Sequence, residues 1–163
     1  MSRRTSAVLS ALITLVIFVG LPLYAPSQIP EEYFEMFSET GVDVNAFIYQ
    51  IATIGLVASV LTLVKGFVPM TSYIYLLASL SSNAMTLYFN LVTFSVGDLA
   101  KLGQLTVTTD IPGGVNTMLL DMRLFIQLAF LAVGLQVIYT VLEFINARKE
   151  EAKAGMETST LPK

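Results

Sequence analysis

The feature that most constrains this chain is a run of about 25 residues, 72–96, that contains no charged residue, no proline and no glycine. A helix of this length exceeds the hydrocarbon core of a bilayer, which is about 30 Å thick, at a rise of about 1.5 Å per residue. Further apolar runs occur at about 6–24, 45–64 and 122–145. The pattern predicts an all-α integral membrane protein whose four transmembrane helices run up-down-up-down in a bundle.

Composition agrees with this class of protein. Hydrophobic side chains make up 55% of the chain and charged ones only 13%, about half the usual soluble share of about 25%. The mean hydropathy is +0.72. We therefore expect residues 1–163 to form one integral membrane domain with the lipid bilayer as its main partner. A net charge of −3 lacks the basic footprint that nucleic-acid binding requires.

The chain contains no histidine and no cysteine, which excludes disulfides, thiolate ligands and imidazole ligands and removes the usual general base. Its carboxylates fall in predicted loops and at helix ends, with no spacing that would bring two of them to one site. We expect no catalytic residue, no metal, no cofactor and no enzymatic activity.

The first apolar run has two interpretations. Arg3 and Arg4 precede it, as basic residues precede the apolar part of a secretory signal peptide. A cleavage site needs small residues ahead of the cut, whereas Leu23 and Tyr24 occupy those positions. The run is also longer than a typical signal-peptide core, so we expect it to be retained as the first span.

The distribution of basic residues predicts the orientation. Lys101, in the loop after the third span, and Arg123, at the entrance of the fourth span, fall on one side. The other seven of the nine basic residues fall on the opposite side: Arg3, Arg4, Lys65, Arg148, Lys149, Lys153 and Lys163. Cytoplasmic loops of membrane proteins carry such an excess. We expect a multi-pass protein of the cell membrane with both termini, including the tail 146–163, in the cytoplasm.

The loop between the first two spans is acidic. Its apolar residues fall at helical spacing, which predicts a short amphipathic helix against the bundle or the headgroups. The simple interpretation is a solvated outer loop, and the alternative is a vestibule that attracts cations. The acids are Glu31, Glu32, Glu35, Glu39 and Asp43.

Small residues follow one face of the second span, where they would let another helix approach closely. This predicted packing face comprises Ala52, Gly55, Ser59, Thr62 and Gly66. Residues 65–70 are predicted to form a tight connection between antiparallel helices.

Polar residues form a second stripe, on the third and fourth spans. It comprises Ser79, Asn83, Thr86, Asn90, Gln136 and Glu143. One interpretation is hydrogen bonding between helices. The predicted partners for the asparagines are Gln136, Tyr139 and Thr140 on the fourth span and Gln50 or Thr53 on the second. The alternative is a hydrated path.

The loop after the third span carries a strand-like alternation at Thr106–Thr109, followed by a strong turn signal at Pro112–Gly114. A re-entrant, filter-like role for these threonines is the alternative to a simple outer loop.

From these features we expect a non-catalytic accessory or scaffolding subunit that packs against other membrane subunits or forms a homo-oligomer. The alternative is an oligomeric ion channel or pore with an acidic outer vestibule.

Overall fold

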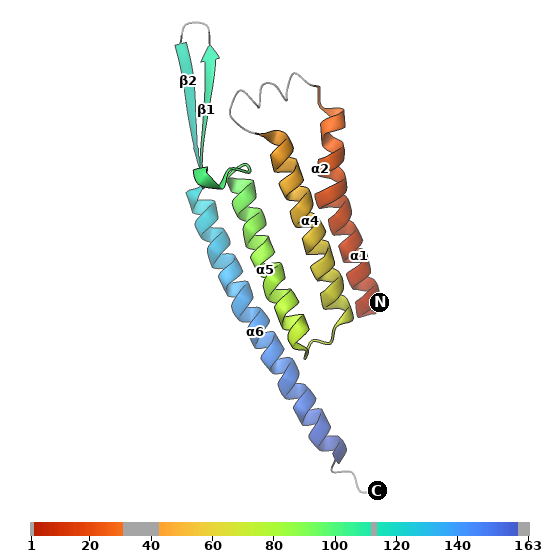
Figure 1. Cartoon of the computed structure of the whole chain (residues 1–163). Helices are drawn as coiled ribbons and strands as arrows, with labels where there is room; N and C mark the ends of the chain where they lie inside the picture. The colour runs from red at the N-terminus through yellow and green to blue at the C-terminus, as the bar shows by residue number, and fades with distance from the viewer. Residues whose placement is uncertain (1, 31–42, 112–113, 160–163) are drawn as a thin grey trace.

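The computed structural model describes residues 2–30, 43–111 and 114–159. The described part of the chain forms four long helical segments and one β-hairpin (Figure 1). The first segment combines α1 (Arg3–Leu15), a π-helical turn η1 (Val16–Gly20), α2 (Leu21–Tyr24) and a 3-10 turn η2 (Ala25–Gln28); the others are α4 (Val44–Phe67), α5 (Tyr73–Phe94) and α6 (Arg123–Ser159).

The irregular turns of the first segment follow from its prolines. Pro22 has no N–H to donate to the carbonyl of Phe18, and its ring crowds that carbonyl. The chain responds by widening the preceding turn into the π-helix η1. The segment nevertheless continues to Gln28, so Arg3–Gln28 counts as one candidate membrane span.

The four helical segments stand side by side as an open row in the order α1, α4, α5, α6, and successive helices run in opposite directions (Figure 1). α4 packs between α1 and α5, and α5 packs between α4 and α6. No comparable packing joins α1 to α6 within the described ranges. The arrangement therefore differs from the predicted bundle, in which the first and last helices would also meet.

Three helices are long and apolar enough to cross a membrane: Arg3–Gln28, Val44–Phe67 and Arg123–Ala154. Such helices indicate a membrane protein. α5 is not among them, because serine, threonine and asparagine side chains dilute its hydropathy. The fourth crossing, by α5, stays a prediction.

Two helix ends differ from the predicted ones. α4 continues to Phe67 and ends at Val68, because the residue before Pro69 is disfavoured in the helical conformation. Lys65 and Gly66 are therefore helical, and the prediction that they begin the connection was wrong. α6 reaches Ser159, well into the predicted tail, because that tail is rich in good helix formers. The short amphipathic helix predicted in the first loop lies outside the described residues.

α5 ends in a left-handed turn at Val96 and Gly97, and a hairpin follows. β1 (Gln104–Ile111) pairs antiparallel with β2 (Gly114–Asp121), with Gln104 opposite Asp121. The hairpin projects from the end of the row that lies away from the N-terminus (Figure 1). The strand predicted at 106–109 is confirmed, whereas its partner β2 was not predicted.

Candidate functional site

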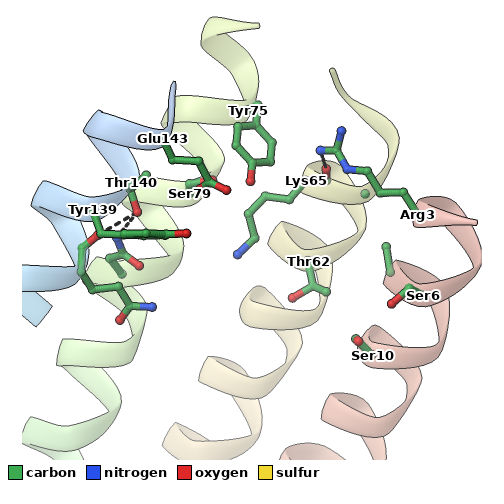
Figure 2. A pocket seen from close by; sticks show the side chains of 14 residues that line it. Arg3, Ser6, Ser10, Thr62, Lys65, Tyr75, Ser79, Tyr139, Thr140 and Glu143 are labelled. Carbon is green, nitrogen blue, oxygen red and sulfur yellow. Dashed lines mark hydrogen bonds between the residues drawn. The ribbon is translucent and has the colours of Figure 1, made fainter. Parts of the chain in front are cut away.

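A cavity of about 410 Å³, which we call the polar hollow, lies at the end of the row that carries the N-terminus. All four helical segments contribute to its wall (Figure 2). Its polar residues are Arg3, Ser6 and Ser10 of α1, Thr62 and Lys65 of α4, Tyr75, Ser79 and Asn83 of α5, and Gln136, Tyr139, Thr140 and Glu143 of α6.

Lys65 directs its ammonium into the polar hollow (Figure 2). Its Nζ donates a hydrogen bond to Ser82 Oγ at 3.1 Å. Lys65 lies two residues before the end of α4 and Ser82 nine residues after the start of α5, so Ser82 is deeper in the row by about 10 Å. A side chain on a helix tilts toward the helix N-terminus, and for α4 that direction points inward, away from the near end of the row.

Two other charged residues stand at the mouth of the hollow. Arg3 donates a hydrogen bond to the backbone oxygen of Lys65, and its guanidinium lies 5.1 Å from the centre of the Tyr75 ring. Glu143 faces the hollow from α6 (Figure 2) and interacts electrostatically with Lys65. The charged groups of the lining are thus two cations and one carboxylate.

A buried hydrogen bond joins α5 to α6 beside the hollow. Asn83 Nδ2 donates to Thr140 Oγ1 at 3.1 Å, and that hydroxyl donates to the backbone oxygen of Gln136 at 2.9 Å. Asn83 is 5% exposed and Thr140 is 7% exposed. Thr140 is one of the partners predicted for this asparagine.

The remaining residues of the predicted polar stripe do not share one surface. Ser79 is buried beside the hollow, and its Oγ has no hydrogen-bond partner in the described structure. Thr86 is exposed and donates to the backbone oxygen of Ser82. Asn90 is half-buried and lies outside the hollow, whereas Gln136 is exposed and Glu143 half-buried at its wall.

The predicted packing face of α4 lies largely under α1. A Cβ atom on Gly55 would come within 2.5 Å of Phe18 Cβ, and one on Gly66 would overlap Ala7 Cβ. Ala52 and Ser59 are buried, and Thr62 is half-buried at the wall of the hollow. This surface is therefore used inside the chain.

Only the last acid of the predicted acidic loop, Asp43, lies among the described residues. Four of its five acids lie outside the described residues: Glu31, Glu32, Glu35 and Glu39. Asp43 caps α4, because its carboxylate accepts a hydrogen bond from Ala46 N at 2.9 Å. Among the described residues, no group of three or more His, Cys, Asp or Glu side chains could hold a metal ion.

A smaller cavity of about 330 Å³ lies between α4 and α5 at the opposite end and includes Gln50 and Tyr88. It shares no lining residue with the polar hollow. Away from the hollow, the rings of Phe18 and Phe89 pack edge to face with their centres 5.3 Å apart.

Sequence reasoning missed Lys65 because it assigned that residue to a loop. Pro69 was the available signal, since a helix ending just before Val68 places Lys65 in its last turn, three residues after Thr62.

Comparisons with protein-family models, with curated proteins and with solved structures found no match to this chain.

Proposed function

We propose that this chain is a four-span protein of the cell membrane, with both termini in the cytoplasm, that acts as a non-catalytic subunit of a membrane assembly. The observation that carries the role in an assembly is the exposed amide of Gln136. This residue lies near the middle of the apolar part of α6, at the wall of the polar hollow, and the neighbouring exposed side chains of the helix include Leu131, Leu135 and Ile138.

The Gln136 amide has two donors and an acceptor, and no hydrogen bond to its side chain is found in the described part of the chain. If lipid tails met this wall of the hollow, leaving the amide in this state would cost several kcal/mol. A neighbouring helix from another subunit, or from a second copy, supplies the partners that lipid lacks.

The position and length of α5 support the fourth crossing. It lies antiparallel between α4 and α6, both of which are apolar enough to span. Its 22 residues extend about 33 Å, enough for a hydrocarbon core of about 30 Å. Its buried polar residues Ser79 and Asn83 face protein rather than lipid.

The orientation rests on charge. Arg3, Lys65 and Arg148 gather toward the end of the row that holds the N-terminus, and an excess of basic residues is typical of the cytoplasmic side.

The partner surface in this proposal is the exposed side of α6. The small-residue face of α4 gives no support for a partner, because η1 covers Gly55 and α1 covers Gly66.

A second candidate is an oligomeric pore, which the exposed hydroxyl of Thr86 and the polar hollow favour. In this candidate, several copies surround the path. A single described chain does not form one, because its two cavities share no lining residue and the apolar Phe18–Phe89 pair lies away from the polar hollow.

The test is purification of the full chain in a mild detergent, with the particle mass measured. We expect a stoichiometric complex in which Gln136→Leu lowers the associated fraction about threefold or more. Gln127→Leu is the matched control, because Gln127 is exposed near the start of α6 and should leave association unchanged.

A chain that is monomeric in lipid nanodiscs, with or without Gln136, contradicts the proposal. A homo-oligomer that passes ions in liposomes, with the flux altered by Asn83→Leu, favours the pore instead.

A further inference from the structure

The polar hollow contains charged groups that helix packing does not require. Lys65 is half-buried and reaches inward rather than toward the near end of the row. Its ammonium carries three donors, and Ser82 Oγ is its hydrogen-bond partner among the described residues. A charged group held in this way within a membrane helix marks a site for an ion, a ligand or a counter-charge.

The charges of the lining select the sign of a ligand. Arg3 and Lys65 contribute two positive charges and Glu143 one negative charge, which leaves a surplus of one positive charge. A monoanion complements this balance.

Hydroxyl donors stand beside these cations. Ser6, Ser10 and Thr62 line the hollow. Ser79 is 7% exposed, and its Oγ has no hydrogen-bond partner among the residues that the structure describes. A buried hydroxyl without a partner destabilises a fold, so Ser79 is a second polar group at this site whose bonding the protein alone does not satisfy. Cations together with hydroxyl donors are the groups that bind the oxygens of a phosphate.

The shape of the row indicates whether a phosphate ligand would come from a lipid headgroup or from solution. Because no close packing joins α1 to α6 within the described ranges, the hollow opens at the side of the row as well as at its end. If the chain crosses the bilayer as proposed above, on which this step rests, that side meets lipid at the cytoplasmic headgroup level. Basic pockets between helices at this level bind phospholipid headgroups.

We propose that the polar hollow binds the phosphate of an anionic phospholipid, with Arg3 at the mouth and Lys65 inside. A zwitterionic lipid has no net charge, because its headgroup ammonium offsets its phosphate. It therefore leaves the surplus positive charge of the hollow unbalanced and binds less well.

Native mass spectrometry of the full chain, reconstituted with equal amounts of phosphatidylglycerol and phosphatidylcholine that carry the same acyl chains, tests this proposal. The wild type should retain phosphatidylglycerol in preference. Lys65→Met should lower that preference about tenfold, because the substitution removes one charge-assisted hydrogen bond to the phosphate.

Two further variants separate binding from folding and from general surface charge. Glu143→Gln increases the surplus positive charge and should strengthen retention, a direction that a folding defect does not produce. Lys149→Met removes the same charge as Lys65→Met from an exposed position outside the hollow and should change nothing. Equal retention of the two lipids by the wild type, or equal losses in Lys65→Met and Lys149→Met, would overturn the proposal.

Inorganic phosphate in excess distinguishes the two sources of this chemistry. If it leaves the bound lipid in place, the lipid is the ligand. If it displaces phosphatidylglycerol and binds in its absence, the lipid assignment is wrong. A chain that crosses the membrane four times yet retains no phosphatidylglycerol overturns this inference alone.

Discussion

The two sides of α1 show how differently the same chain joins its helices. Toward α4, α1 and the turn η1 that continues it meet glycines, and the backbones come close enough that a Cβ on Gly66 or Gly55 has no room. On the side where α6 could have closed the bundle, α1 instead presents Arg3, Ser6 and Ser10 to the polar hollow. The close contact needs small residues, whereas the open side carries polar ones.

The contrast has a physical cause. Lipid is as apolar as leucine, so helices in a membrane associate through close packing and polar contacts rather than through the hydrophobic effect. The glycines of α4 provide close packing. The polar residues of the hollow gain from association where another helix or a ligand supplies hydrogen bonds. Within the described ranges, α6 supplies such bonds to α5, where Thr140 accepts from Asn83 and Arg148 donates to Tyr73.

The largest expected effect lies in the close contact. Gly55→Ala should lower the free energy of unfolding by about 3 kcal/mol, because the backbone of Phe18 blocks the new methyl group. Unfolding by sodium dodecyl sulfate in mixed micelles measures this loss. Gly134→Ala is the matched control, because nothing lies within 4 Å of a Cβ at Gly134; it should be neutral or slightly stabilising. If Gly55→Ala and Gly134→Ala lowered the free energy of unfolding equally, the close contact with α4 would not depend on a small residue at Gly55, and the contrast with the open side would be wrong.

On the open side, a substitution should stabilise the fold. Ser79→Ala removes a buried hydroxyl without a partner and should raise the free energy of unfolding by about 1 kcal/mol in lipid-free detergent. The same variant should retain phosphatidylglycerol about threefold less well. Destabilisation by Ser79→Ala would show that the hydroxyl already has a partner within the protein.

The smallest expected effect is at the contact between α5 and α6. A double-mutant cycle with Asn83→Ala and Thr140→Val should give a coupling energy of about 0.6 kcal/mol, the average for hydrogen bonds between membrane helices. Unfolding of the two single variants and the double variant measures it. A coupling energy near zero would mean that the Asn83–Thr140 hydrogen bond does not stabilise the contact between α5 and α6.

The sequence predicted what depends on local pattern. Apolar run length located the four helices, and the spacing of small residues identified the face of α4 that α1 covers. The residue type of Asn83 indicated a buried polar partner, which is found in Thr140.

Local sequence pattern did not predict the features that depend on contacts between distant segments. Whether α1 and α6 close a bundle or stand at opposite edges of a row is decided by contacts between distant segments. Lys65 became a site residue only because α4 extends one turn further and borders that open side. β2 was missed because its residues lack a clear alternation and are held by pairing with β1.

The central claim is that every helix of the row crosses the membrane, α5 included, with the polar hollow on the cytoplasmic side. The chain contains no cysteine, so single substitutions report directly on each end of α5. Asn116→Cys, in β2, should react with a membrane-impermeant maleimide in intact cells, and Met70→Cys, in the exposed connection between α4 and α5, only after permeabilisation. Labelling of both positions from the same side would contradict the account.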